Sequence, residues 1–114
     1  MYSFYLTSIS RSGSFGPWLV TADEVGDPSA LTLTTRLNGE VMQHSTTDLL
    51  IHDVAAIIAY LSEFTGMRPG DIIATGTPGG VGVARDPAVF MQPGDTIEVE
   101  ISDIGVLSNE IAQE

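Results

Sequence analysis

The residue types best suited to chemistry in this chain gather in one short segment, Thr75-Gly76-Thr77-Pro78-Gly79-Gly80-Val81-Gly82. Its glycines allow the backbone to approach a ligand closely. Successive amides in such a turn can form a concave nest that favours an anion, and Thr75 and Thr77 add hydroxyl groups. The composition leaves two interpretations open: a plain turn, or a loop that binds a carboxylate or a phosphate.

Two carboxylates at Glu98 and Glu100 have a spacing that can serve a divalent ion when both side chains turn inward. The alternation of Ile97, Val99 and Ile101 around them predicts a strand with both glutamates on its polar face. We therefore expect a solvated strand face at this position, and not a metal site.

His44 and His52 stand eight residues apart across an expected turn, which is weak support for a metal site. We expect neither histidine to be a ligand. Trp18, the one tryptophan, follows Gly16-Pro17 and is expected to be a packed core aromatic.

The charge balance excludes several functional classes. The chain has four arginines, no lysine, fifteen acidic residues and a formal net charge of −11. Because a phosphate backbone or an anionic membrane requires clustered basic residues, neither nucleic acid nor membrane is an expected partner. The absence of lysine also excludes Schiff-base chemistry and the phosphate-loop lysine. We expect a cytoplasmic protein, because the start of the chain lacks the basic region of a secretory signal.

The elements that must position these residues follow from simple patterns. Residues 31–37 alternate in polarity, Asn38-Gly39 follows, and residues 40–44 continue, which predicts a β-hairpin with a type I′ turn. Leu31, Leu33 and Leu37 would share one face.

One convincing helix is predicted from Asp53, its cap, to Gly66. The apolar stripe Val54, Ile57, Ile58, Leu61 and Phe64 marks it as a packing helix.

Pro69-Gly70 and Pro93-Gly94 predict two tight turns, feeding strands at 72–75 and 96–101, with a last strand at 106–111. The expected fold class is mainly β with one packed α-helix.

Several of these segments, in this order, resemble the C-terminal half of the fumarylacetoacetate hydrolase superfamily. The resemblance rests on Gly16-Pro17-Trp18, on Leu37-Asn38-Gly39-Glu40, on the run from Pro69 through the Thr-Gly-Thr-Pro loop to Gly82, and on the second Pro-Gly-Asp turn at 93–95. It divides the chain into a non-matching segment, 1–14, and a partial C-terminal domain, 15–114.

The resemblance implies part of a mixed β-roll fold and Mg²⁺- or Mn²⁺-dependent chemistry on small 2-oxo acids. Such chemistry includes acylpyruvate hydrolysis, oxaloacetate decarboxylation, and isomerisation or decarboxylation in aromatic catabolism. It also implies that Thr75, Gly76, Thr77, Pro78, Gly79 and Gly80 bind substrate, with Thr77 contacting its carboxylate. Family members are commonly homodimers, which points to a homo-oligomer.

The resemblance also has a gap. The metal ligands and the catalytic base of the family lie upstream of the Gly-Pro-Trp segment, and Glu98 and Glu100 match a different, late strand. No residue of this chain is therefore expected to be catalytic or to ligate metal. Three hypotheses remain: part of an enzyme, a truncated non-catalytic relic, or a small carboxylate-binding or oligomerising module. Removing half of a β-roll also leaves apolar faces unpartnered, so we expect oligomerisation or marginal stability.

Overall fold

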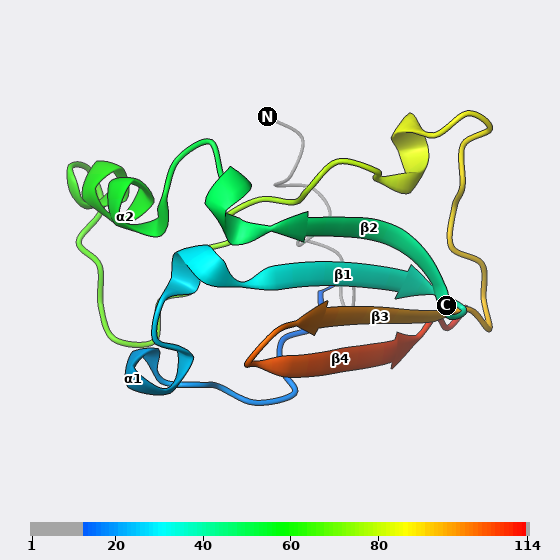
Figure 1. Cartoon of the computed structure of the whole chain (residues 1–114), viewed down its shortest axis with the longest axis horizontal. Coiled ribbons are helices and arrows are strands. Elements are labelled where there is room, and N and C mark those ends of the chain that lie inside the picture. Colours follow the sequence, from blue (N-terminus) through cyan, green and yellow to red (C-terminus); the bar gives the residue numbers. More distant parts are fainter. Residues whose placement is uncertain (1–12, 114) are drawn as a thin grey trace.

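The computed structural model describes residues 13–113 and forms one four-stranded antiparallel sheet with the order β2-β1-β3-β4 (Figure 1). Only residues 13 and 14 of the expected N-terminal segment, 1–14, lie within the described range. The strands and the two α-helices are α1 (Ala22–Val25), β1 (Thr32–Leu37), β2 (Glu40–Thr46), α2 (Val54–Ser62), β3 (Thr96–Ile101) and β4 (Gly105–Glu110). Single-turn 3-10 helices occur at Pro28–Ala30, Thr47–Leu49 and Gly82–Ala84.

The predicted hairpin is confirmed. β1 and β2 pair from Leu37↔Glu40 to Thr32↔Thr46. Asn38 and Gly39 both have positive φ, 52° and 83°, as a type I′ turn requires. The register is interrupted between Thr35, which pairs with Gln43, and Arg36, which pairs with Val41. Met42 is therefore the extra residue of a β-bulge.

The two Pro-Gly turns contain the same side-chain-to-backbone hydrogen bond. In each turn the aspartate after the glycine accepts a hydrogen bond at 2.7 Å from the backbone N–H three residues earlier, Arg68 in one turn and Gln92 in the other. The second turn leads into β3 as predicted, and β4 follows it.

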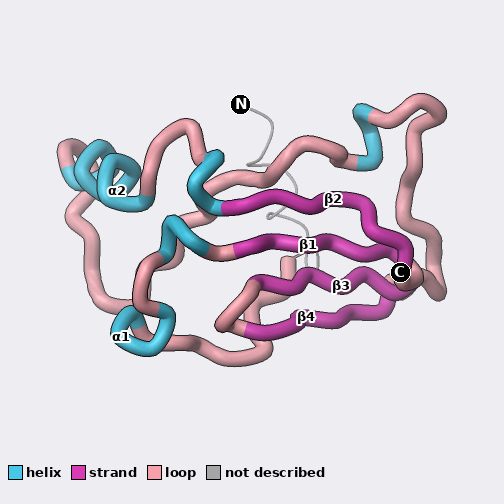
Figure 2. The backbone as a smooth tube through the Cα atoms, viewed as in Figure 1, coloured by secondary structure: helices cyan, strands magenta, loops and turns pink. Residues whose placement is uncertain are grey.

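The strand predicted at 72–75 is wrong, because this segment has no regular structure and Ile72 is 69% exposed. A strand needs a neighbour for its backbone hydrogen bonds, and no described segment pairs with residues 72–75. The loop at Thr75 therefore does not leave a buried strand. Figure 2 shows instead a long irregular path between α2 and β3.

The predicted helix forms, and Asp53 caps it by accepting a hydrogen bond from the Ala56 N–H at 2.7 Å. It ends at Ser62, four residues before the expected Gly66. Its packing differs from the prediction: no residue of α2 is buried. The last residue of the stripe, Phe64, is 63% exposed. Figure 1 places α2 beyond the end of the sheet, where the strands offer it little surface.

The described residues bury little apolar surface. Leu31, at 6% exposure, is their one buried hydrophobic residue, accompanied by Thr34 and Thr35 at the centre of β1. The expected core role of Trp18 is not observed, because this side chain is 61% exposed. Its indole N–H donates to the carbonyl of Ile104, and its ring lies against Gly105 in the β3–β4 turn.

Within residues 13–113, no helix has the length and apolar character needed to cross a lipid bilayer.

Asp95 joins three parts of the fold and generates a prediction about acid stability. Its carboxylate accepts from the Asn38 side-chain amide at 2.8 Å and from the Gln92 N–H at 2.7 Å. The Asn38 amide oxygen accepts from the Thr96 N–H at 2.9 Å. These bonds, the one from Asn38 foremost, lower the pKa of Asp95 below its ordinary 3.8. The folded state binds the proton of Asp95 more weakly than the unfolded state does, so these bonds stabilise the fold above pH 3.8. This stabilisation is lost as the pH falls through the lower pKa that Asp95 has in the folded state.

We expect Asp95→Asn to lower the denaturation midpoint at pH 7, because the new amide would face the Asn38 amide. The loss should be smaller at pH 3, because the stabilisation that comes from a lowered pKa diminishes as the pH falls below the ordinary value of 3.8. Asp71→Asn is the matched control, because Asp71 makes the same turn bond but has no contact with the hairpin in the described chain. Denaturant titrations monitored by circular dichroism at both pH values test this, and an equal loss for both variants would contradict it.

Candidate functional site

The Thr75–Gly80 loop runs beside the outer edge of β2. Figure 1 shows the chain returning along this edge after α2, and side-chain hydrogen bonds from Gln43 confirm the proximity. Every loop residue except Pro78 is exposed.

Two side chains hold the carbonyl groups of the loop. The Gln43 side-chain N–H₂ donates to the carbonyl of Pro78 at 2.7 Å and lies 3.4 Å from that of Gly79. The guanidinium of Arg85 donates through Nε to the carbonyl of Gly80 at 3.1 Å. Arg85 Nη2 also donates to the carbonyl of Met42. The loop is thus attached to β2 through its acceptors.

The bulge in β2 explains why these contacts are available. Met42 has no cross-strand partner, and its carbonyl is bound by Arg85. Gly80, with φ of +96°, approaches the same carbonyl so closely that a Cβ at this position would lie 2.8 Å from the Met42 oxygen. A non-glycine residue would therefore meet both backbone strain and a steric clash at position 80.

In contrast to these carbonyls, the backbone N–H groups of the loop have no hydrogen-bond partner among the described residues. Among residues 13–113, no amide N–H of Thr75, Gly76, Thr77, Gly79 or Gly80 donates to a protein acceptor. These amides are left for solvent or a ligand, and the hydroxyls of the two threonines lie on the same segment. Backbone donors without a protein acceptor suit a ligand that only accepts hydrogen bonds, such as a carboxylate.

The local charge has the sign that an anion requires. The salt bridge in the described part of the chain joins Arg36 to Glu100 at 2.6 Å, so the guanidinium of Arg85 has no carboxylate partner there. In a chain with a net charge of −11, this places an uncompensated cation beside Gly80.

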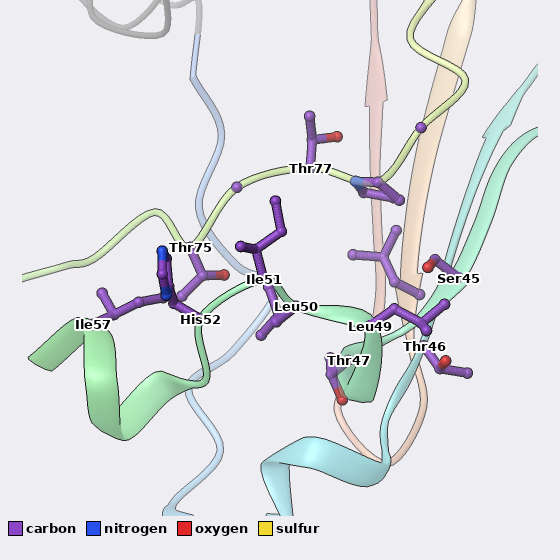
Figure 3. Close-up of a pocket in the computed structure, with 14 residues that line it drawn as sticks. Ser45, Thr46, Thr47, Leu49, Leu50, Ile51, His52, Ile57, Thr75 and Thr77 are labelled. Carbon is purple, nitrogen blue, oxygen red and sulfur yellow. The ribbon is translucent and has the colours of Figure 1, made fainter. Parts of the chain in front are cut away.

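A cavity of about 600 Å³ lies beneath the loop, lined by Leu33 and Ser45 of the sheet, residues of the segment 46–52, Ile57 of α2, and Thr75–Gly79. Figure 3 shows the hydroxyl of Thr75 on the side of Ile51, whereas the side chain of Thr77 points away from it. The two threonines therefore present their hydroxyl groups on different sides of the loop.

The histidines are not brought together. His52 lines the cavity, whereas Nδ1 of His44 lies 3.0 Å from the hydroxyl of Thr34 within the hairpin. Sequence reasoning assigned neither residue to a metal, and the structure supplies no shared ligand geometry in residues 13–113.

The glutamates of β3 do not fit a divalent metal. Glu100 is held by Arg36, and Glu98 is the cross-strand partner of that same arginine. The ion pair with Arg36 neutralises the carboxylate charge of Glu100 that a cation would need. No group of three histidine or carboxylate side chains converges elsewhere in the described residues. The residues present thus do not supply the Mg²⁺ or Mn²⁺ site that the resemblance implies for the family.

Sequence reasoning located the loop but missed Gln43 and Arg85. The sequence analysis counts Arg85 among four arginines and includes Gln43 in the expected hairpin segment 40–44, and it assigns neither residue a role at the loop. The one available signal was the position of Arg85 five residues after Gly80, within reach of the loop. Nothing in the sequence marks the bulge that brings Met42 and Gln43 to the loop.

We expect Gly80→Ala to displace the loop from β2, because its methyl group would meet the Met42 carbonyl. Gly79→Ala is the matched control, since a Cβ at position 79 meets no atom within 4 Å. Amide chemical shifts of Met42 and Gln43 should change strongly in the first variant and little in the second. Equal perturbation by both variants would contradict the close approach at position 80.

Comparison with known proteins places these features in one family. The family model described as fumarylacetoacetate (FAA) hydrolase C-terminal matches residues 3–112. The matched range begins within the segment 1–14 that the sequence analysis set apart, so the boundary at residue 15 stays a prediction.

Relatives and solved structures agree with this match. The mitochondrial oxaloacetate tautomerase FAHD2A of Bos taurus is 48% identical over 96 residues, which cover 84% of this chain and 31% of the relative. A fumarylacetoacetate hydrolase from Exiguobacterium antarcticum superposes with a TM-score of 0.84 at 43% identity, covering 88% of this chain and 36% of that one.

A maleylpyruvate hydrolase from Sphingobium sp. SYK-6, solved in complex with manganese(II) and pyruvate, has a TM-score of 0.77 at 39% identity, covering 86% of this chain and 34% of that one. The chain thus spans about a third of the length of the proteins that it matches. With its hairpin, its Thr-Gly-Thr-Pro loop and its mainly β fold, it belongs to the fumarylacetoacetate hydrolase family and corresponds to the C-terminal part of that family's proteins.

Proposed function

We propose that this chain supplies the carboxylate-binding loop, Thr75–Gly80, of a protein that acts on small 2-oxo acids. The observation that supports the proposal is the polarity of the loop: the carbonyls of Pro78, Gly79 and Gly80 accept from Gln43 and Arg85, while the loop amides have no protein acceptor in residues 13–113. A solved relative holds pyruvate, a small 2-oxo acid, together with manganese.

In this proposal the loop binds and orients the substrate. A carboxylate has two oxygens with several lone pairs and no donor, so it can accept from backbone amides and from a threonine hydroxyl at once. The guanidinium of Arg85, which has no carboxylate partner in residues 13–113, adds electrostatic attraction without itself contacting the ligand. Carbon–carbon bond cleavage, decarboxylation or tautomerisation then require groups beyond those that the described residues bring together.

We assign no residue of this chain to the divalent metal, because Glu100 is neutralised by Arg36 and no other acidic cluster forms in residues 13–113. The same observation supports a second candidate function, a carboxylate-binding or oligomerising module without catalysis. Metal-dependent turnover of oxaloacetate distinguishes them: the chain by itself is expected to show none, and robust turnover by the purified chain would overturn our assignment of its residues.

Association with further copies of the chain is part of the proposal. Among the described residues, fifteen large hydrophobic side chains are exposed, and Leu31 is the one buried hydrophobic residue. So small a core leaves apolar surface that association would cover. The cytoplasmic location stays a prediction, since the relatives include proteins named as mitochondrial.

The binding proposal predicts a saturable, carboxylate-dependent response to pyruvate. Titrating the purified chain with pyruvate in EDTA should shift the amide resonances of Thr75–Gly80 and leave those of β3 and β4 unchanged. Pyruvamide is the ligand control, because it keeps the 2-oxo group but lacks the negative charge. Arg85→Gln should weaken pyruvate binding by about tenfold, the effect of one charge interaction of about 1.4 kcal/mol. An equal response to pyruvamide, or no response to pyruvate, would contradict the proposal.

The association proposal predicts oligomers whose stability rises with salt. Copies that each carry a net charge of −11 repel one another, and salt screens this repulsion while leaving apolar burial in place. Sedimentation velocity at 0.05 M and 0.5 M NaCl is the measurement. Ile51→Gln, at a side chain that is 92% exposed, should weaken association if the apolar surface drives it. A monomer that melts cooperatively under both conditions would be the contrary result.

A further inference from the structure

We infer that Gln43 is a positioning residue that makes the hydroxyl of Thr77 an obligatory hydrogen-bond donor toward the bound carboxylate. The inference rests on the proposed function of the loop and adds a residue that the family resemblance did not bring to this site. The evidence for it is the set of contacts that the side-chain amide of Gln43 makes beside the β-bulge of β2.

The Gln43 amide nitrogen lies near three oxygen atoms of the loop. They are the Pro78 carbonyl at 2.7 Å, the Thr77 hydroxyl at 3.2 Å and the Gly79 carbonyl at 3.4 Å. Two of these oxygens belong to carbonyl groups, which can only accept. The N–H₂ group must therefore face the loop, because the opposite orientation of the amide would place an oxygen against both carbonyls.

This orientation decides the role of the threonine. One N–H of Gln43 serves the Pro78 carbonyl, and the other is directed toward the Thr77 hydroxyl, with the Gly79 carbonyl slightly farther away. A hydroxyl that accepts from an N–H turns its own hydrogen elsewhere. Thr77 is exposed and makes no other hydrogen bond to the described residues, so that hydrogen is available to a ligand.

An obligatory donor favours a group that only accepts. A free hydroxyl can rotate to serve either kind of partner, whereas the Thr77 hydroxyl, fixed by Gln43, loses less orientational freedom when a carboxylate binds. The loop backbone is held at the same time, because the second N–H fixes Pro78. Gln43 thus acts through Thr77 and does not itself touch the ligand.

A double-mutant cycle on the full 114-residue chain tests this role, with pyruvate as the probe and amide chemical shifts as the readout. Gln43→Met keeps the length of the side chain and removes its donors, and Thr77→Val removes the hydroxyl. We expect each single variant to raise the dissociation constant for pyruvate by about tenfold, and the double variant to be no weaker than Thr77→Val by itself.

Gln92→Met is the matched control, because among residues 13–113 the Gln92 side chain donates only to the Phe90 carbonyl at 3.3 Å, outside the loop. It should leave pyruvate binding unchanged. In a Thr77→Ser background, which restores the hydroxyl, the tenfold effect of Gln43→Met should return. This rescue separates positioning of the hydroxyl from general support of the loop.

The possible results differ for the two proposals. If Gln43→Met weakens binding as much in the Thr77→Val background as in the wild type, or if it has no effect in the wild type, the role of Gln43 is overturned and the loop remains a carboxylate site. If the wild type fails to bind pyruvate, both the proposed function and this inference fall.

Discussion

The arrangement of this protein depends on one backbone irregularity, the β-bulge at Met42. An edge strand offers a row of unpaired backbone groups, and the bulge turns one of these carbonyls toward Arg85 while Gln43 faces the returning chain. Arg85 also donates to the carbonyl of Gly80, so the side chains of Arg85 and Gln43 together attach the loop to the edge of the sheet. A segment without secondary structure thereby acquires a defined conformation.

The same contacts divide the hydrogen-bonding groups of the loop by chemical type. The carbonyls of Pro78, Gly79 and Gly80 are bound by the protein, and the backbone N–H groups of the loop are left without an acceptor in residues 13–113. This division, together with a guanidinium at Arg85 that has no carboxylate partner among those residues, is the basis on which we propose an anion site in a strongly acidic chain. The acids of β3 play no comparable part, because Arg36 lies among them and ties Glu100 to the sheet.

The packing of the described residues is consistent with a chain that spans a third of its relatives. One strand, β1, contains the buried Thr34 and Thr35, while α2 lies at the end of the sheet without a buried residue. The apolar stripe of α2 is suited to pack against a second apolar surface, and residues 72–75 are suited to pair with a strand. Among the described residues, neither element has that partner. Their exposure explains why the hairpin and the helix are predicted correctly, whereas the packing of the helix and the strand at 72–75 are not.

Sequence alone determined the features that depend on a few neighbouring residues. Asn38-Gly39 specified the hairpin turn, Asp53 the start of the helix, and the two Pro-Gly-Asp turns their shared hydrogen bond, because each is decided by local backbone preferences and one side-chain bond. The tertiary structure decided the rest: the bulge, the partners of the loop, the exposure of Trp18 and the unpaired state of residues 72–75. These features depend on which segments, distant in the sequence, come into contact. The contact between Gln43 and Pro78 is an example, because nothing in the local sequence around either residue predicts the other as its partner.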